Sequence, residues 1–280
     1  MMAEAVKMEN STGIYYTDLK GEDIFKKYGL KKRETLGKGS AGKVYLVQTK
    51  DGHRRTLALK KFSLTHSDRE LKFHLFSREA EFMQIVNHPH LVPCIMAACC
   101  DKYAAIVMPY YPQGDLVLEG RQEPRLVHRL MSHVARALEH LHKHNIAHND
   151  LKLENIFMDG SGRAHLGDLG LAIKVEDGSG TAPAWRVGGT DDYWAPEKLE
   201  AEHEDNIDPF KCDVYALGIM YFTLVTGQDF EAGTDFLAGL QCAKGVDLST
   251  AQRSTLERLL EPNPAERPTA SQVVIMMNKK

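Results

Sequence analysis

The segment AHNDLKLENIF, residues 147–157, places His148, Asp150, Lys152 and Asn155 within eight positions. A carboxylate can orient an attacking hydroxyl group, an ammonium group can stabilise charge on a phosphate, and an amide oxygen can bind magnesium. Asp150, Lys152 and Asn155 supply these three groups in one short segment. The segment therefore indicates the transfer of a phosphoryl group to a hydroxyl group.

A further carboxylate, that of Asp168 in HLGDLG, is flanked by Gly167 and Gly170. A hard divalent ion that bridges phosphate oxygens needs a carboxylate at a turn that can place it. Taken alone, an aspartate beside glycines is more often an ordinary turn residue. The neighbouring motifs decide between the two interpretations.

The segment LGKGSAGKVYLV contains Gly37, Gly39 and Gly42 in the spacing GxGxxG. This spacing alone also suits a simple hairpin. A dinucleotide-binding turn requires a helix directly after its glycines, whereas the run from Val44 to Val47 is β-branched and apolar, as in a strand. A glycine loop between two strands indicates a flap whose backbone amides cover the phosphates of a nucleotide.

Lys60 ends the string LALK, and Glu79 follows in SREAEFM. A lysine that steadies the phosphates of a nucleotide must itself be held by a carboxylate. Either residue alone could be a solvated surface charge. Their position after the glycine loop favours a paired lysine and glutamate.

Periodicity and turn residues predict the elements that must hold these groups. Strands are expected over residues 30–36, 44–48, 57–62, 91–100 and 103–108, with a tight hairpin at Asp51 and Gly52. Helices are expected over residues 71–86, 124–144, 214–226 and 254–260, and after Thr269. This pattern predicts an α+β fold with a small, mainly β lobe that carries one helix, followed by a larger, mainly helical lobe.

The predicted boundaries follow from changes in composition. Residues 1–27 lack a clear period and are expected to form an extension that is mobile or lies over the domain. Residues 28–280 form the domain itself, with a small lobe over about 28–108, a hinge rich in Pro, Gly and Tyr over about 109–113, and a large lobe over about 114–280.

Composition excludes several classes of function. The net charge of -3 gives no strong positive field, so nucleic acid is not expected as a partner. The five cysteines show no metal-ligand spacing, and the longest apolar run, residues 214–225, is too short to span a bilayer. His140, His142 and His144 are not expected to bind metal. We expect an intracellular, cytoplasmic protein, with the nucleus also compatible; the sequence does not determine the oligomeric state.

Six motifs occur in a fixed order: GxGxxGxV, LALK, the glutamate at 79, HNDLKLEN, DLG and WAPE. Together they make the chain, from about Tyr28 to its end, closely similar to the eukaryotic-type protein kinase family. The resemblance implies a two-lobed protein-kinase-like fold with ATP in the cleft under the glycine loop, Mg²⁺ as the metal and proteins as substrates. Lys152 and Thr190 are typical of the serine/threonine class.

The resemblance also implies roles for individual residues. Catalytic roles fall to Asp150 as the base and to Lys152, Lys60, Glu79 and Thr190, and magnesium ligation falls to Asn155 and Asp168. ATP contacts fall to Leu36, Gly37, Lys38, Gly39, Ser40, Ala41, Gly42, Val44, Ala58, Lys60, Met108, Pro109, Tyr111 and Phe157. Met108 stands at the gatekeeper position. Glu197 and Arg267 resemble a buried ion pair, and Asp213 resembles the aspartate that holds the catalytic loop.

One departure from the family pattern concerns regulation. Asn149 stands where the family usually has arginine before the catalytic aspartate, giving HND in place of HRD. This removes the cation that would pair with a phosphorylated activation loop. We therefore predict activity that does not depend on phosphorylation within residues 171–189. Leu169, in place of the Phe of DFG, keeps an apolar side chain and is expected to be tolerated.

Two rival functions remain open at this point. A pseudokinase scaffold would bind partners or nucleotide without turnover, but Lys60, Asp150, Asn155 and Asp168 are all present. A small-molecule kinase would share the distant fold but would lack the glycine flap and the APE string. Detectable phosphate transfer to protein separates both rivals from the main prediction.

Overall fold

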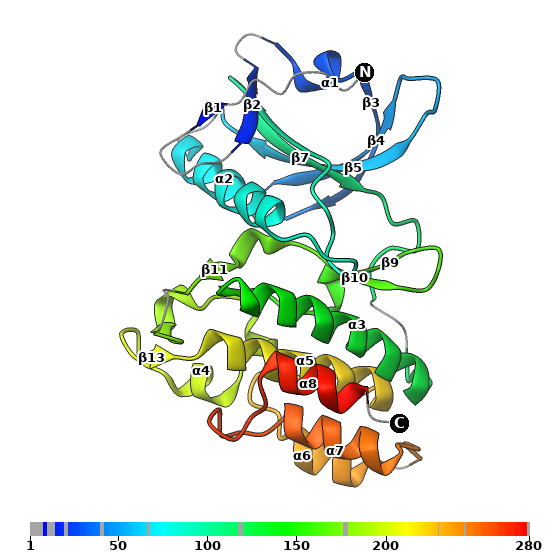
Figure 1. Ribbon diagram of the computed structural model, residues 1–280, viewed down its shortest axis with the longest axis vertical. Coiled ribbons are helices and arrows are strands. Elements are labelled where there is room, and N and C mark those ends of the chain that lie inside the picture. Colours follow the sequence, from blue (N-terminus) through cyan, green and yellow to red (C-terminus); the bar gives the residue numbers. More distant parts are fainter. Residues whose placement is uncertain are drawn as a thin grey trace. The chain divides into compact units, whose positions relative to one another are not determined.

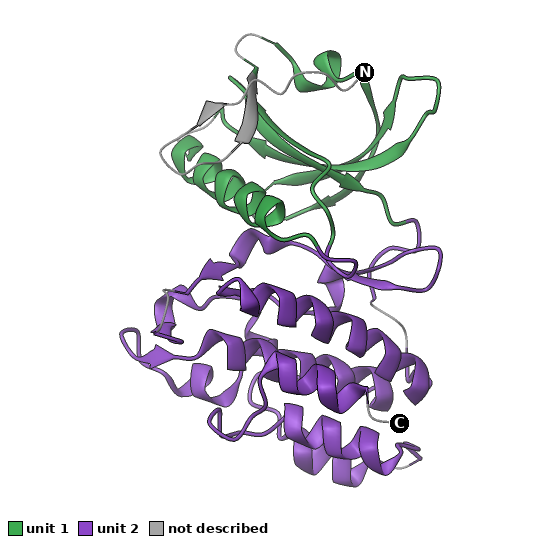
Figure 2. Cartoon of the chain, viewed as in Figure 1, with its two compact units in different colours: residues 1–87, 92–111 green, residues 88–91, 112–280 purple. Residues whose placement is uncertain are grey.

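The computed structural model describes residues 8–9, 15–19, 22–39, 42–65, 68–116, 120–175, 179–228, 230–243 and 245–278. The chain divides into two compact units (Figure 2). Unit 1 comprises residues 1–87 and 92–111, and unit 2 comprises residues 88–91 and 112–280. The division after Tyr111 falls inside the predicted hinge. Within the described ranges, no helix is both long and apolar enough to cross a membrane.

Unit 1 is built on a sheet with the strand order β1-β2-β6-β7-β5-β4-β3 (Figure 1). The strands are β1 (Met8–Glu9), β2 (Tyr15–Leu19), β3 (Leu30–Lys38), β4 (Lys43–Thr49), β5 (Thr56–Ser63), β6 (Met96–Cys100) and β7 (Tyr103–Pro109). Neighbouring strands from β6 to β3 run antiparallel, whereas β2 joins β6 in parallel. The central strands β5 and β7 are thereby held on both sides.

The two faces of this sheet differ because successive side chains point to opposite sides. On one face, Tyr45, Val47 and Leu59 join an apolar core with Ile24 of the short helix α1 (Ile24–Lys27). The opposite face carries Lys60. Here helix α2 (Arg69–Ile85) packs through the ring of Phe76, whose centroid lies 5.7 Å from that of Phe62. Lys60 therefore lies on the face that α2 covers.

Unit 2 is mainly helical. Its helices are α3 (Pro124–Lys143), α4 (Pro196–Glu200), α5 (Pro209–Thr226), α6 (Phe236–Cys242), α7 (Thr250–Leu259) and α8 (Ala270–Met277). Helix α3 buries Leu130, Val134 and Leu138, which recur every four residues and so form one apolar stripe. Helix α5 is buried along most of its length and packs against α3 (Figure 1).

The remaining elements of unit 2 are short and lie within or around residues 147–157, called the catalytic segment below. They are β8 (Ile146–Ala147), η1 (Leu153–Asn155), β9 (Ile156–Met158), β10 (Ala164–Leu166), η2 (Leu169–Leu171), β11 (Ile173–Lys174), β12 (Ala182–Pro183), η3 (Ala184–Arg186), η4 (Asp191–Tyr193) and β13 (Asn206–Ile207). The pairs β9–β10, β8–β11 and β12–β13 are antiparallel. The β8–β11 pair ties residues 173–174 to the start of the catalytic segment, and the β12–β13 pair ties residues 182–183 to residues 206–207.

Several boundaries differ from the prediction. Helix α5 begins at Pro209 instead of residue 214, because Asp208 caps it and proline suits its first position. Helix α7 begins at Thr250 instead of residue 254, since Ser249 forms a capping box. Strand β6 begins at Met96 instead of residue 91, where Pro93 lacks an amide for a ladder bond. The predicted tight hairpin at Asp51 is a longer loop over residues 50–55.

The segment predicted as an N-terminal extension contributes regular elements to unit 1. Strand β2 pairs with β6, and α1 buries Ile24 completely. The Asp23 side chain caps α1 through the Lys26 amide and accepts a hydrogen bond from the Tyr103 hydroxyl at 3.0 Å. Ile24 therefore belongs to the packed core of the unit, with Phe25 packed against that core, and the sheet-and-one-helix prediction missed this second, shorter helix.

Candidate active site

The glycine loop joins β3 to β4. The Gly39 amide donates to the Gly42 carbonyl at 2.9 Å, which closes the turn. A Cβ atom on Gly42 would lie 2.1 Å from the Lys61 carbonyl oxygen, whereas one on Gly37 or Gly39 would meet nothing within 4 Å. Gly42 is therefore needed for close backbone packing, and the other two glycines leave open space above the loop. Ser40 and Ala41, predicted to contact ATP, lie outside the described residues.

The predicted nucleotide contacts of the sheet share one face. Lys60 pairs with Val44 on one side, and Ala58 pairs with Met108 on the other. Paired residues point to the same face of a sheet, and residues two apart in a strand do likewise. Val44, Ala58, Lys60 and Met108 thus form one surface of unit 1. Pro109, at the end of β7, and Tyr111 follow directly, while Leu36 and Lys38 are exposed on β3.

Lys60 forms a buried ion pair with Glu79 of α2. The Lys60 Nζ atom lies 2.8 Å from each carboxylate oxygen of Glu79. The side chains are 10% and 2% exposed, respectively. Since a buried charge is costly without a partner, this geometry requires both residues to remain charged and in place.

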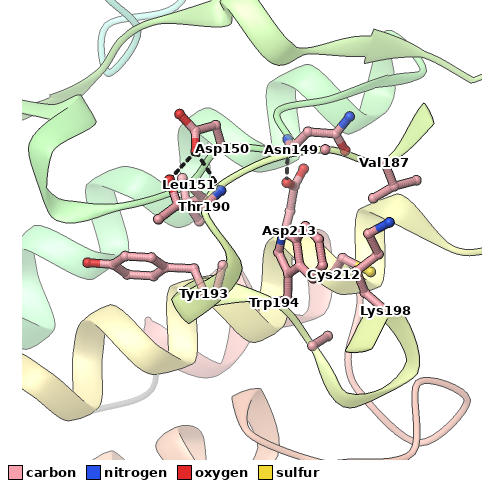
Figure 3. Close-up of a pocket in the computed structure, with 13 residues that line it drawn as sticks. Asn149, Asp150, Leu151, Val187, Thr190, Tyr193, Trp194, Lys198, Cys212 and Asp213 are labelled. Atoms are coloured by element: carbon pink, nitrogen blue, oxygen red, sulfur yellow. Dashed lines mark hydrogen bonds between the residues drawn. The ribbon is translucent and has the colours of Figure 1, made fainter. Parts of the chain in front are cut away.

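Asp213 of α5 holds the catalytic segment by its backbone. Its Oδ2 atom accepts from the His148 amide at 2.8 Å, and its Oδ1 atom accepts from the Asn149 amide at 2.9 Å (Figure 3). The His142 Nε2 atom lies 2.9 Å from the same carboxylate. His148 also bonds the Gly167 carbonyl through Nε2, at 2.9 Å. The rigid helix α5 therefore fixes the residue that precedes Asp150.

Three predicted catalytic and metal-binding residues converge on the carboxylate of Asp150. The Thr190 hydroxyl and amide donate to its Oδ1 atom at 2.8 and 3.1 Å (Figure 3). Lys152 Nζ lies 3.0 Å from Oδ2 and donates to the Thr190 hydroxyl at 2.8 Å. Asn155 Nδ2 donates to the Asp150 carbonyl at 2.7 Å and to Oδ2 at 3.2 Å. These contacts hold the carboxylate in one orientation.

The same contacts determine the charge of Asp150. Burial alone would raise its pKa, but the hydrogen bonds from Lys152 and Thr190 and the charge of Lys152 outweigh burial and hold the pKa below its usual range. Asp150 is therefore a carboxylate at neutral pH. In that state it can accept a hydrogen bond from a hydroxyl group.

Asn155 and Asp168 offer oxygen ligands of the kind that magnesium prefers. The Gly167 amide donates to the Asn155 carbonyl at 2.8 Å, so the backbone links the two segments. Both hydrogen bonds from the Asn155 amide nitrogen go to Asp150, so the Oδ1 atom of Asn155 is the end of the side chain that suits a metal ion. Asp168 is exposed and left-handed, with φ at 55°, and its Oδ1 atom accepts from Gly170. The donor set fits a hard divalent cation.

Comparison with known proteins decides the family. The sequence pattern of the protein kinase domain matches residues 30–277. The chain belongs to the protein kinase family. This also establishes the two-lobed kinase fold, with a small β lobe and a helical lobe, and implies ATP as substrate together with a divalent metal ion.

Similar curated proteins are serine/threonine kinases of modest identity. Aurora/IPL1-related protein kinase 2 of Caenorhabditis elegans is 28% identical over 85% of this chain and 78% of its own length. Aurora kinase of Saccharomyces cerevisiae is 30% identical over 83% and 64%. CBL-interacting protein kinase 9 of Oryza sativa subsp. japonica is 28% identical over 86% and 54%. The match thus spans only about half to three quarters of each relative.

The ion pair predicted between Glu197 and Arg267 is present in the kinase. Arg267 NH1 and NH2 donate to the two carboxylate oxygens of Glu197 at 2.7 and 3.0 Å. The Arg267 side chain is fully buried, and its ring-stacked partner, Tyr215, lies 4.7 Å away. The Cys212 thiol also approaches Glu197, at 3.6 Å, and burial raises the pKa of this thiol.

A pocket of unit 2 adjoins Asp150 (Figure 3). Its lining includes residues to which the motifs assigned no role, namely Leu151, Val187, Tyr193, Trp194, Lys198 and Cys212. Leu151 lies within HNDLKLEN and Trp194 within WAPE, whereas the only sequence signal of the others was their proximity to WAPE or to Asp213. Phe157, predicted to contact ATP, is half-buried on β9 and forms an isolated bridge with Asp115. Among the described residues, no group of three or more His, Cys, Asp or Glu side chains is arranged to hold a metal ion.

Proposed function

We propose that this kinase transfers the γ-phosphate of ATP to serine and threonine hydroxyls of other proteins, with Asp150 as the base. The observation that carries the proposal is the convergence of Thr190, Lys152 and Asn155 on the Asp150 carboxylate. The serine/threonine preference is supported by the bond between Lys152 and Thr190 and by the named relatives. A fixed carboxylate beside a cation suits attack by an alcohol on a phosphoryl group.

The hydrogen bonds indicate where an acceptor hydroxyl would bind. Oδ1 of Asp150 already accepts two hydrogen bonds from Thr190. Oδ2 accepts from Lys152 and, in the longest of these contacts, from Asn155 at 3.2 Å. An incoming hydroxyl group can replace this longer contact and donate its proton toward Oδ2. Lys152 then stabilises negative charge on the transferred phosphoryl group.

Each unit carries groups that suit a nucleotide and its metal ion. Lys60, oriented by Glu79, would contact phosphate oxygens, and the open space above Gly37 and Gly39 would let backbone amides approach them. The Oδ1 atom of Asn155 and the carboxylate of Asp168 would hold Mg²⁺, which neutralises charge on the phosphates when bound.

The first test is transfer of labelled phosphate from ATP and magnesium to a generic basic protein, followed by identification of the labelled amino acid. Label on serine or threonine is the expected result. Label confined to tyrosine would overturn the acceptor class. ATP binding without any transfer would favour the rival scaffold function.

We also propose that activity does not depend on phosphorylation of residues 171–189, called the activation segment below. Strand β12 of this segment pairs with β13, and the Ala184 amide donates to the Asp205 carbonyl at 2.7 Å. Apolar residues of the segment, Ile173, Ala182 and Val187 among them, join a buried cluster. These contacts order the described part of the segment without a phosphate.

Ser179 and Thr181 are the only hydroxyl-bearing residues of the activation segment. The variant Ser179→Ala/Thr181→Ala removes both acceptors. Its rate of phosphate transfer should stay within about twofold of wild type, since neither exposed hydroxyl contributes to the buried cluster. A loss of activity in a variant with unchanged thermal stability would contradict this part of the proposal.

A further inference from the structure

Asn149 has a backbone conformation that few residue types accept. Its φ is 65°, in the left-handed region, which asparagine tolerates better than most residues. The Asn149 amide bonds Asp213, and Gly189 packs so closely on its carbonyl that a Cβ atom there would lie 2.1 Å from the oxygen. The backbone is thus held from two sides, and Figure 3 shows the side chain directed away from Asp213.

The Asn149 side chain reaches both ends of the activation segment. Its Nδ2 atom donates to the Leu171 carbonyl at 3.2 Å and, in a longer contact, to the Arg186 carbonyl at 3.5 Å. These carbonyls are 15 residues apart in the sequence. One amide group therefore links the start of the segment to the turn that precedes Val187 and the pocket beside Asp150.

The other end of the amide has an unfavourable environment. Asn149 Oδ1 is buried and has no hydrogen-bond partner within the described ranges. Turning the amide over would place this oxygen against two carbonyl oxygens, so the observed orientation follows from the acceptors. A buried acceptor without a partner lowers stability, which is unexpected for a purely structural side chain. Such a cost is typical of residues kept for function.

The position opposite Asn149 also carries no phosphorylatable group. Arg186 has a guanidinium group that donates to the Lys174 carbonyl at 3.4 Å. Lys174 is itself exposed, so the stretch of the activation segment that Asn149 contacts carries two cationic residues, Lys174 and Arg186. An arginine at position 149 would add a third cation to this stretch, whereas the neutral amide of asparagine adds no charge.

We propose that Asn149 is a positioning residue: its amide holds the activation segment in the conformation that receives the protein substrate, in place of a cation that would need a phosphate. The inference rests on the proposed kinase function and extends it. It assigns to one neutral side chain the task that charge pairing performs in phosphate-dependent switches. It also explains why the amide tolerates its unpaired oxygen.

The variant Asn149→Gly tests the proposal because glycine adopts the left-handed conformation without strain and removes only the side chain. The KM for a protein substrate should rise about tenfold, as expected for the loss of two hydrogen bonds, while the KM for ATP stays unchanged. The melting temperature should not fall, since the buried unpaired oxygen is removed as well. Asn145→Gly is the matched control, because Asn145 is also left-handed, with φ at 58°, and should leave both KM values unchanged.

Hydrogen exchange gives a readout that does not depend on turnover. The Ala184 and Trp185 amides, bonded to the carbonyls of Asp205 and His203, should exchange at least several-fold faster in Asn149→Gly than in wild type. This readout separates the two proposals. If wild type transfers no phosphate, the proposed function fails, but faster exchange in the variant would still support the positioning role.

A charge exchange provides the sharper test. Asn149→Arg alone should lower kcat/KM at least tenfold, because it replaces the amide that bonds the Leu171 and Arg186 carbonyls and adds a cation to a stretch that already carries Lys174 and Arg186. The double variant Asn149→Arg/Arg186→Glu should recover most of that loss, since the two side chains can then pair. Equal KM and exchange rates in wild type and Asn149→Gly, or a double variant no better than Asn149→Arg, would overturn the proposal.

Discussion

Each unit of the kinase contains a buried ion pair that joins distant parts of the sequence, and the two pairs are built differently. In unit 1, the ammonium group of Lys60 contacts both oxygens of Glu79 at 2.8 Å. In unit 2, the guanidinium group of Arg267 pairs with Glu197 at 2.7 and 3.0 Å. Both pairs contain a glutamate carboxylate, and they differ in the cation, which is an ammonium group in unit 1 and a guanidinium group in unit 2.

Arg267 also donates to three backbone carbonyls. These belong to Glu261, Lys211 and Pro262, at 2.8, 2.8 and 3.1 Å. A planar guanidinium group with five donors can satisfy fixed acceptors all around it, whereas a compact ammonium group can share its charge with a mobile ligand. The pair in unit 2 is therefore part of the scaffold, while the pair in unit 1 is suited to a ligand.

The largest expected effect is on the scaffold pair. Arg267→Met leaves the Glu197 carboxylate and three carbonyls without their donor, so the free energy of unfolding should fall by about 3–5 kcal/mol. The melting temperature should drop by about 10 °C. Thermal unfolding monitored by circular dichroism checks this, with the exposed Arg258→Met as control. A loss below about 1 kcal/mol would remove the distinction between the two pairs.

The second largest expected effect is on kcat/KM and comes from the pair in unit 1. Lys60→Met should lower kcat/KM by about a hundredfold, because a preorganised cation near the phosphates is lost. Lys61→Met is the matched control, since Lys61 lies over the Tyr103 ring, 4.1 Å away, on the other face of the sheet. Steady-state kinetics gives the ratio.

The double variant Lys60→Met/Glu79→Gln sharpens the comparison. With neither charge left, stability should return close to that of wild type, while activity should stay low. The corresponding variant of the scaffold pair, Arg267→Met/Glu197→Gln, should stay unstable, because the three carbonyls still lack donors. Recovered activity in the first double variant would contradict a ligand-binding role for Lys60.

A smaller effect is expected within the glycine loop. Gly42→Ala should cost about 1–3 kcal/mol, because its Cβ would collide with the Lys61 carbonyl 2.1 Å away. Gly39→Ala meets nothing within 4 Å and should leave stability unchanged while raising the KM for ATP. Urea unfolding and ATP titration of both variants distinguish a packing glycine from a ligand-facing one. Equal stabilities would contradict this assignment.

The smallest expected effect is on the stability of the protein at acidic pH, and it arises from two histidines of unit 2. Burial, reinforced by neighbouring histidines, lowers the pKa of His88 and of His133 to about 4. The His88 ring stacks on that of His140 at 5.1 Å, and the His133 ring stacks on that of His90 at 4.2 Å. Because the unfolded chain binds protons more readily, this contribution to stability is present above pH 6.5 and is lost as the pH falls toward 4.

The variant His88→Asn/His133→Gln tests whether these two histidines lower the stability of the protein as the pH falls. Its melting temperature should depend less on pH between 6.5 and 4 than that of wild type, as measured by calorimetry across that range. A steeper dependence in the variant would show that the two histidines titrate in the opposite sense.

The sequence predicted the elements whose signal is local. The strand over residues 30–36 and the helix over 124–144 appear as β3 and α3 within a few residues, because the glycine turn that ends the strand and the four-residue apolar stripe of the helix are properties of the segment alone. The predicted first residues of α5 and α7 lie too late in the sequence. In both helices the periodic apolar residues begin only after a polar first turn that follows the capping residue. Strand β2 was missed because its pairing with β6 depends on residues about 80 positions away.

The candidate site likewise has a part that the sequence predicted and a part that it did not. Motif spacing identified Asp150, Lys152 and Asn155 as a group within one segment. The contact of Asn149 with the Arg186 carbonyl, and the lining of the pocket by Trp194 and Lys198, were not predictable, because they depend on how the activation segment folds back. Non-local packing of short segments leaves no periodic signal in a sequence.

The central claim is that Asp150 is the base of a working phosphotransferase. The most direct test compares the initial rate of phosphate transfer by wild type and by Asp150→Asn at saturating ATP and magnesium, after equal ATP binding and equal melting temperatures have been verified. We expect transfer by wild type and a rate at least a hundredfold lower in the variant. Equal rates would contradict the assignment of Asp150, and no transfer by wild type with ATP bound would contradict the proposed function itself.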